Sequence, residues 1–162
     1  MTADGDRADG SPAMSLVFRA GRLLCALHLD EVIETMRPLA VHPLAGTPAF
    51  VRGISIMRGI PAPVIDVARL LGGTDAPASR FVAVRTGRGP IAFATGEVLG
   101  IQPIIAAETE RQYTPLLGVA PTRLVAAIGT LHTEPLFLMQ SMRLVPDEVW
   151  AAAASAAWPG PA

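Results

Sequence analysis

Short runs in which apolar and β-branched residues alternate with polar ones recur along most of the chain, separated by turns that contain glycine or proline. Alternation with a period of two is typical of strands with one buried face, and two such runs around a short glycine turn indicate a hairpin. The pattern predicts strands over 15–19, 22–29, 54–58, 60–67, 80–86, 90–95, 98–105, 123–130 and 134–139. Many short strands with turns between them favour barrels or a sandwich over a parallel α/β fold.

Two stretches of this pattern are less regular. Residues 30–36 alternate enough to continue as a strand, and a helical turn stays open as the alternative. Three prolines between 38 and 48 then indicate a loop, because proline fixes φ and lacks a donor. In Ile60–Val67, Pro61 and Pro63 stand at alternate positions, so both missing N–H groups lie on one edge. This spacing predicts a strand at the solvent-facing edge of its sheet.

The two ends of the chain differ from its middle in composition. Residues 1–13 are polar, acidic and contain Gly and Pro, and we expect them to be disordered. Residues 14–145 form the predicted domain, with a linker containing Gly and Pro at 74–79 as a seam. Residues 146–162 are an alanine-rich tail, in which Asp147–Ala157 has a proline-led, acidic helix start. Shorter helical turns are expected at 68–71, 140–144 and, as an alternative to a loop, 108–121.

Length, composition and charge narrow the class of protein. A chain of 162 residues with 51% hydrophobic residues can bury the core of one domain, or of two small barrels that share one core. No run approaches the roughly 20 apolar residues of a membrane helix, and the acidic N-terminus lacks the apolar segment of a signal peptide. We therefore expect a cytoplasmic protein without direct membrane insertion. The net charge of −1, with scattered arginines, argues against nucleic-acid binding.

Candidate chemistry is sparse in this sequence. Cys25 is the only cysteine and stands in an apolar run, so we interpret it as a buried side chain rather than a reactive thiol. The histidines lack partners at metal-ligand spacing, and the sequence has no phosphate-binding loop or nucleophile motif. These observations predict a protein without catalytic residues, cofactors or metals. An enzyme or small-molecule binder stays open as an alternative that requires an enclosed polar pocket.

The segment from Pro43 to Leu71 stands out instead. It combines a proline-containing loop, two apolar strands joined by Arg58 and Gly59, and Asp66 at the end of the second strand. Gly59 allows a positive φ or the close approach of another chain. Arg58 can hold a partner's carboxylate with its planar fork, or pair within the chain, with Asp66 as the candidate. Asp66 itself is expected to cap the following helical turn rather than to contact a partner.

The same segment resembles the signature of the CheW family. Residues 46–67 contain Thr-Pro, a glycine-led strand that reaches Arg-Gly, and then a proline, two hydrophobic residues, an aspartate and a further hydrophobic residue. Upstream, Val32 and Glu34 are similar to the family's Val-x-Glu element. Residues 80–101 resemble its second-half hairpin, and 136–144 resemble its final strand and turn. The resemblance therefore covers most of the chain.

This resemblance implies a fold, partners and a binding surface. Proteins of the CheW family consist of two intertwined, SH3-like five-stranded β-barrels around a continuous apolar core, and they have no catalytic activity. One surface pairs with the regulatory domain of a CheA-type histidine kinase, and a groove between the barrels takes the cytoplasmic tip of a methyl-accepting chemoreceptor. By position in the motifs, Val32, Glu34 and Arg58 would face the receptor or control its coupling. Gly59 would permit the bend that places Arg58.

Two departures from the family pattern support a second hypothesis. The family's asparagine before Leu-Arg-Gly is Ile56 here, and its Val-Asp before a turn in the second half is Thr95-Gly96. The first hypothesis is a mostly β, non-enzymatic chemotaxis adapter that links chemoreceptors to a CheA-type kinase in membrane receptor arrays. The second keeps the fold but makes the chain a scaffold for another signalling or pilus-type motility pathway.

Overall fold

Two five-stranded sheets make up most of the computed structural model, which describes residues 12–73, 77–105, 125–140 and 145–155. Sheet A contains, in spatial order, β8 (Val98–Ile104), β1 (Ala13–Ala20), β2 (Leu23–His28), β10 (Glu134–Met139) and β9 (Val125–Leu131). Sheet B contains, in spatial order, β3 (Val32–Met36), β6 (Arg80–Thr86), β7 (Gly89–Thr95), β5 (Ile60–Asp66) and β4 (Val51–Met57). The helical segments of the described residues are η1 (Leu29–Glu31), α1 (Val67–Leu70) and α3 (Asp147–Ser155). This architecture confirms the predicted mostly β fold with two barrels.

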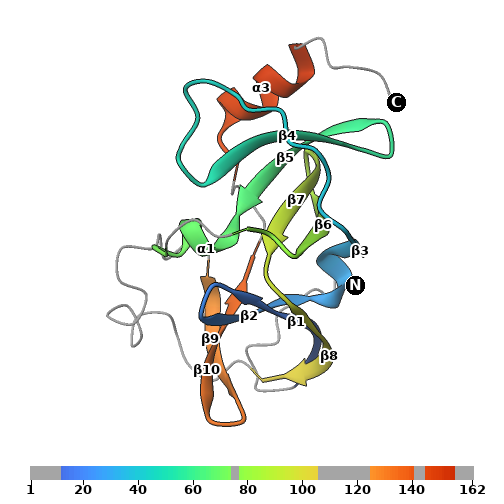
Figure 1. Ribbon diagram of the computed structural model, residues 1–162. Helices are drawn as coiled ribbons and strands as arrows, with labels where there is room; N and C mark the ends of the chain where they lie inside the picture. The colour runs from blue at the N-terminus through green and yellow to red at the C-terminus, as the bar shows by residue number, and fades with distance from the viewer. Residues whose placement is uncertain (1–11, 74–76, 106–124, 141–144, 156–162) are drawn as a thin grey trace.

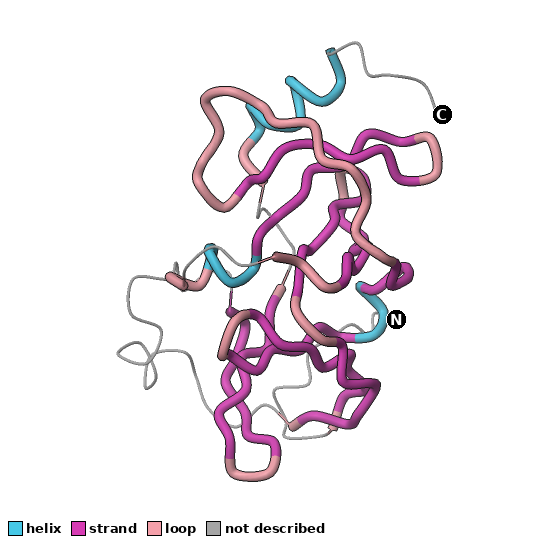
Figure 2. The backbone as a smooth tube through the Cα atoms, in the orientation of Figure 1, coloured by secondary structure: helices cyan, strands magenta, loops and turns pink. Residues whose placement is uncertain are grey.

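The chain crosses from one sheet to the other and back, as the tube in Figure 2 shows. It begins in sheet A with β1 and β2, builds sheet B from β3 to β7, and returns to sheet A with β8 to β10. In Figure 1, sheet A forms the lower half of the molecule and sheet B the upper half. The edge strands β8 and β9 of sheet A lie in contact, which curls that sheet toward a closed barrel.

Three apolar clusters fill the two sheets and the space between them. The largest, which we call the shared core, lies between the sheets and includes Phe18, Leu27, Val82, Phe93 and Met139. The other face of sheet A buries a second cluster around Val17, Leu24 and Leu138, and the other face of sheet B buries a third around Val64, Phe81 and Ala92. Because the central strands are buried on both faces, β6 and β7 have nearly continuous apolar sequences rather than alternating ones.

β5 is not an edge strand along its whole length, which corrects the prediction made from its prolines. It lies between β4 and β7. It pairs with β4 from Ile60 to Ile65, but with β7 only over Val64–Asp66. The first half of β5 therefore has an open side. On that open side, the missing N–H groups of Pro61 and Pro63 break no hydrogen bonds to a neighbouring strand.

The helical segments refine the other expectations. Residues 30–36 contain both alternatives in succession, because η1 is followed directly by β3. Asp66 caps α1 as predicted, and its carboxylate accepts a hydrogen bond from the Arg69 N–H at 3.2 Å. α3 confirms the helix in the C-terminal tail, and it packs on β5 of sheet B.

Three predictions lie wholly or largely outside the described residues: the disorder of the N-terminal tail, and the segments 108–121 and 140–144. No helix within the described ranges is long and apolar enough to cross a membrane.

Candidate interaction surfaces

A tight turn joins β4 to β5 at the tip of their hairpin. Met57 pairs with Ile60, which leaves Arg58 and Gly59 as a two-residue loop. The φ angles of Arg58 and Gly59 are +50° and +81°, as in the type I′ turns whose twist matches that of a hairpin. Glycine adopts this conformation freely, whereas each other residue loses about 1–2 kcal/mol in it. The turn places the Arg58 side chain at an exposed tip of sheet B.

The partner of Arg58 is Glu34 of β3, and not Asp66 as the sequence had suggested. Arg58 Nε donates to Glu34 Oε2 at 2.6 Å, and Nη2 donates to Oε1 at 2.7 Å. Two parallel bonds of this kind fix both the distance and the orientation of the guanidinium. Asp66 is out of reach because it lies at the other end of β5 from the turn. Since β3 and β4 are the two edges of sheet B, the ion pair links the hairpin tip to the opposite edge strand.

This ion pair is largely in water. The side chain of Arg58 is 76% exposed and that of Glu34 is 28% exposed. The hydrogen bonds from Arg58 lower the pKa of the Glu34 carboxyl, and the same bonds raise the pKa of the Arg58 guanidinium. Exposed pairs contribute little to stability, because solvent screens them and two long side chains lose freedom. The pair therefore orients a surface arginine more than it stabilises the fold.

Val32 lies on a different face of β3 from Glu34. The register shifts between them, so that Val32 pairs with Val84 while Glu34 pairs with Ala83. Val84 belongs to the shared core and Ala83 to the cluster on the other face of sheet B. Val32 consequently packs, half-buried, against the shared core. Two residues two positions apart would share a face in a regular strand, so the sequence did not reveal this separation. The structure brings together Glu34, Arg58 and Gly59, but not Val32.

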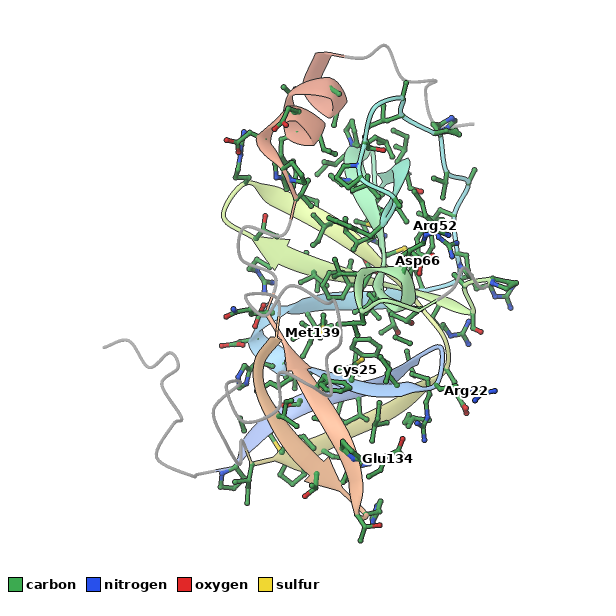
Figure 3. The ribbon with its side chains drawn as sticks, turned by 90° about the vertical axis from the view of Figure 1, so that its left-hand side faces the viewer. Arg22, Cys25, Arg52, Asp66, Glu134 and Met139 are labelled. Atoms are coloured by element: carbon green, nitrogen blue, oxygen red, sulfur yellow. The ribbon has the colours of Figure 1, made fainter. Side chains whose placement is uncertain are left out.

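A second ion pair joins the base of the same hairpin to α1. Arg52 Nε and Nη2 both donate to Asp66 Oδ2, at 3.1 Å and 2.8 Å. The Asp66 side chain is 3% exposed, and Figure 3 shows it beside Arg52. Arg52 was not among the residues predicted from the sequence. Arg52 lies where the register of the hairpin shifts between Val51 and Gly53, so counting back from the turn would not have placed it beside Asp66.

Exposed apolar side chains occur in both halves of the molecule. Those in or next to sheet B are Ile33, Leu39 and Ile60, and those in or next to sheet A are Met14, Leu99, Ile101 and Ile105. Leu39 belongs to the loop that runs along β4, where the carbonyl of its neighbour Ala40 accepts a hydrogen bond from Ser55 Oγ at 2.7 Å. Ile33 and Ile60 are sequence neighbours of the Glu34–Arg58 pair. Apolar side chains near an oriented charge are typical of protein interfaces.

The apolar side chains of sheet A form a row that we call the β1–β8 face, defined by Met14, Leu99, Ile101 and Ile105. In the ladder, Met14 pairs with Pro103 and Leu16 with Ile101. Leu16 is buried in the shared core, whereas Ile101 is 52% exposed. The β1–β8 face therefore continues the apolar surface of the shared core outward to an edge of the sheet. These four residues were not among those predicted from the sequence. In Figure 1, β8 lies on the same side of the molecule as β3.

Cys25 is fully buried, and burial raises the pKa of its thiol to about 12. This confirms its interpretation as a buried apolar side chain. Among the residues that the structure describes, no three or more His, Cys, Asp or Glu side chains gather in a group that could hold a metal ion.

The fold and the hairpin motif together define a class of protein. The model of the CheW-like domain family matches residues 15–148. The chain therefore belongs to the CheW-like domain family.

Known proteins agree with this assignment. The chain is 32% identical over 94 residues to Protein FrzA of Myxococcus xanthus, in an alignment that covers 56% of this chain and 59% of that protein. It thus matches less than two thirds of the length of this curated relative. The crystal structure of the scaffolding protein TtCheW from Thermoanaerobacter tengcongensis has the same fold, with a TM-score of 0.68 at 21% identity. That likeness covers 81% of this chain and 90% of TtCheW.

Proposed function

We propose that this protein is a non-catalytic, cytoplasmic adapter of membrane receptor arrays. It binds the cytoplasmic tip of a methyl-accepting chemoreceptor and the regulatory domain of a CheA-type histidine kinase at the same time. The observation that carries this proposal is the bidentate Arg58–Glu34 pair at an exposed hairpin tip. Both residues occupy motif positions in a chain that belongs to the CheW-like domain family.

The pair suits a docking surface for a physical reason. A guanidinium held by two hydrogen bonds has already lost most of its rotamer freedom, so less entropy is lost when a partner binds. Docking also removes water from the pair, which strengthens its electrostatic interactions. The exposed side chain of Ile60, next to the turn, supplies apolar area beside the charge.

A receptor tip needs a larger surface than one ion pair, and the β1–β8 face supports that role. A receptor tip is helical, and an amphipathic helix binds through a row of apolar anchors in an apolar groove. The β1–β8 face offers Met14, Ile101 and Ile105 at the rim of the shared core between the barrels. In this proposal the receptor helix covers that rim and reaches the Arg58–Glu34 pair.

Substitution of Arg58 tests the proposal. Arg58→Ala should weaken binding to a receptor tip fragment about tenfold or more, while the thermal midpoint stays nearly unchanged because the pair is exposed. Arg58→Lys keeps the charge but loses the fork, so it should also weaken binding. Arg80→Ala, which removes an exposed arginine from β6 of the same sheet, is the matched control. Normal receptor binding by Arg58→Ala, or its unfolding, would contradict the assignment.

The alternative function is a scaffold for another signalling or pilus-type motility pathway. The departures from the family pattern at Ile56 and at Thr95-Gly96 favour it. Thr95 is buried, and its hydroxyl donates to the Gly96 carbonyl at 3.0 Å. A Cβ at Gly96 would lie 3.2 Å from the Arg19 carbonyl oxygen, so this turn fits closely against β1. A pull-down from cells that recovers a receptor but no CheA-type kinase would support this second function over the first.

A further inference from the structure

A cleft of about 220 Å³ lies at the junction of the two sheets, at the other end of β5 from the Arg58 turn. Its walls are the end of β1, the end of β7 with the following turn, the start of α1 and the segment before β6. The lining residues are Arg19, Ala20, Gly21, Asp66, Ala68, Pro77, Ala78, Ala94, Thr95, Gly96 and Glu97. The proposed receptor contacts, which are the Arg58–Glu34 pair and the β1–β8 face, do not use the residues of this cleft.

Backbone hydrogen bonds between the sheets hold the walls of the cleft in place. The Arg19 N–H donates to the Glu97 carbonyl at 2.9 Å, and the Gly96 N–H donates to the Arg19 carbonyl at 2.8 Å. Within sheet B, the Ser79 N–H donates to the Thr95 carbonyl at 2.9 Å and joins the segment before β6 to the end of β7. Gly96 has no side chain, and this allows the turn to pack closely against Arg19 of β1. The cleft is therefore preformed, as binding sites commonly are.

The uncompensated charge at this cleft is negative. Arg19 is neutralised by Glu134, to which its Nη1 and Nη2 donate at 2.6 Å and 3.1 Å. No residue in the described ranges forms a salt bridge with the exposed Glu97 carboxylate. The pKa of Arg19 is raised mainly by its hydrogen bonds to Glu134, and Glu97 adds a smaller attraction. Glu97 therefore lies near enough to attract Arg19 weakly, and its exposed carboxylate can still accept hydrogen bonds from a second cation.

We propose that the cleft receives one arginine side chain of a partner polypeptide, with its guanidinium against Glu97 and its stem against Ala68 and Ala78. The volume is below the roughly 300 Å³ at which small-molecule sites begin, but it suits a single side chain. Arginine is among the residues that anchor interfaces in such pockets. Its planar fork can pair with the exposed Glu97 carboxylate, whereas Asp66 in the wall is already held by Arg52.

An anion or a neutral apolar group fits this cleft less well. An anion would have to compete with Glu134 for Arg19 and would be repelled by Glu97. An apolar group would remove water from Glu97 without giving it a partner, which is unfavourable. The neighbouring Arg22 points outward from the β1–β2 turn and away from Asp66 (Figure 3), so its charge is solvated.

Titration of the full, isotope-labelled chain with Nα-acetyl-arginine amide, followed by amide NMR shifts, tests this proposal. The control ligand is the citrulline counterpart, which has the same shape without the charge. We expect saturable shifts at Gly21, Gly96 and Glu97 with the arginine compound only. Glu97→Gln should weaken its binding at least fivefold, whereas Glu148→Gln, which removes an exposed acid of α3, should leave it unchanged.

Three results would overturn the proposal: no saturable shift at the cleft, equal binding of the citrulline compound, or unchanged affinity in Glu97→Gln. Arg58→Ala should bind the arginine compound like the unmodified chain, because the turn and the cleft lie at opposite ends of β5. The titration can therefore disprove the arginine site without disproving the proposed adapter function. Loss of receptor binding in Arg58→Ala likewise leaves the arginine site untested by that variant and open to the titration.

Discussion

At the scale of single residues, two hairpin tips hold non-glycine residues in the left-handed backbone region. The β4–β5 tip combines Arg58 at φ +50° with a glycine, whereas the β9–β10 tip combines His132 at +50° with Thr133 at +67°. A threonine is poorly suited to this region, because its branched Cβ crowds the backbone. The Arg58 tip presents a side chain with a bidentate partner. At the other tip, glycine would relieve the strain.

Thr133→Gly should raise the free energy of unfolding by about 1 kcal/mol, since glycine has no Cβ at a positive φ. Urea unfolding of both proteins measures the difference. Thr130→Gly places the same substitution in the extended strand β9, where it should instead destabilise by about 0.5–1 kcal/mol. Equal effects of the two substitutions would contradict the strain at the tip.

Because Glu34 pairs with Arg58, we expect the free energy of unfolding to depend slightly on pH in the acid range. Arg58 lowers the folded-state pKa of Glu34, so the pair stabilises the fold above the unfolded-state pKa of about 4.3. That contribution is lost as the pH falls from there through the lower folded-state value. The stability difference between the unmodified chain and Glu34→Gln should therefore shrink over this window, measured by urea unfolding at each pH. A difference that grows as the pH falls would reverse the sign of this linkage.

At the scale of elements, the loop between β3 and β4 covers the edge of sheet B. The His42 N–H donates to the Ile54 carbonyl at 2.8 Å, and the Ile54 N–H donates to the His42 carbonyl at 2.9 Å. A covered edge is protected from pairing with other chains. The contact depends on Gly53, where an added Cβ would lie 2.2 Å from the His42 carbonyl oxygen.

Gly53→Ala should destabilise the protein by about 3 kcal/mol or more, because the methyl overlaps a backbone atom at a φ of +141°. Thermal or urea unfolding would record this loss. Gly46→Ala is the matched control: its φ is +77°, but nothing lies within 4 Å of the added Cβ. It should lose only about 1 kcal/mol. Similar losses of unfolding free energy for both alanine variants would show that the contact of Gly53 with the loop between β3 and β4 is not the cause.

Sequence patterns predicted the hairpins well and the sheet order poorly. The glycine turns at 59 and 87–89 mark where strands reverse, and this depends on local backbone preferences. The parallel pairing of β5 with β7 and the register shift in β3 depend on tertiary contacts, which a single sequence does not encode locally. The same holds for the site. Arg58 and Gly59 were found from the motif, but the contact with Glu34 rather than Asp66 depends on how sheet B curls.

At the scale of the whole molecule, the shared core makes the two barrels one body. It contains side chains of both sheets, and Val145 and Val149 of the C-terminal region join it. α3 follows the last strand of sheet A yet packs on β5 of sheet B. Arg88 of the β6–β7 turn pairs with Asp147 and lies over the Trp150 ring, 5.8 Å from its centre. The helix of the alanine-rich tail, whose packing partner the sequence did not reveal, therefore packs on sheet B and contributes to the shared core.

Val149→Ala should lower the free energy of unfolding by about 1.5–3 kcal/mol, because it removes two buried methyl groups and leaves a cavity. Unfolding should stay cooperative, since both barrels share the affected core. Glu148→Ala, at the adjacent exposed position of α3, should change the free energy by less than about 0.5 kcal/mol. A Val149→Ala value as small as that of the control would show that α3 does not contribute to the shared core.

Simultaneous binding of two partners is the central claim, and a ternary complex tests it most directly. The purified chain is mixed with a CheA-type regulatory domain and a chemoreceptor tip fragment, and the complex is measured by size-exclusion chromatography with light scattering. We predict one species that contains all three components, which loses the receptor fragment when Arg58→Ala replaces the unmodified chain. Displacement of one partner by the other, or no binding of either to the folded chain, would contradict the adapter function.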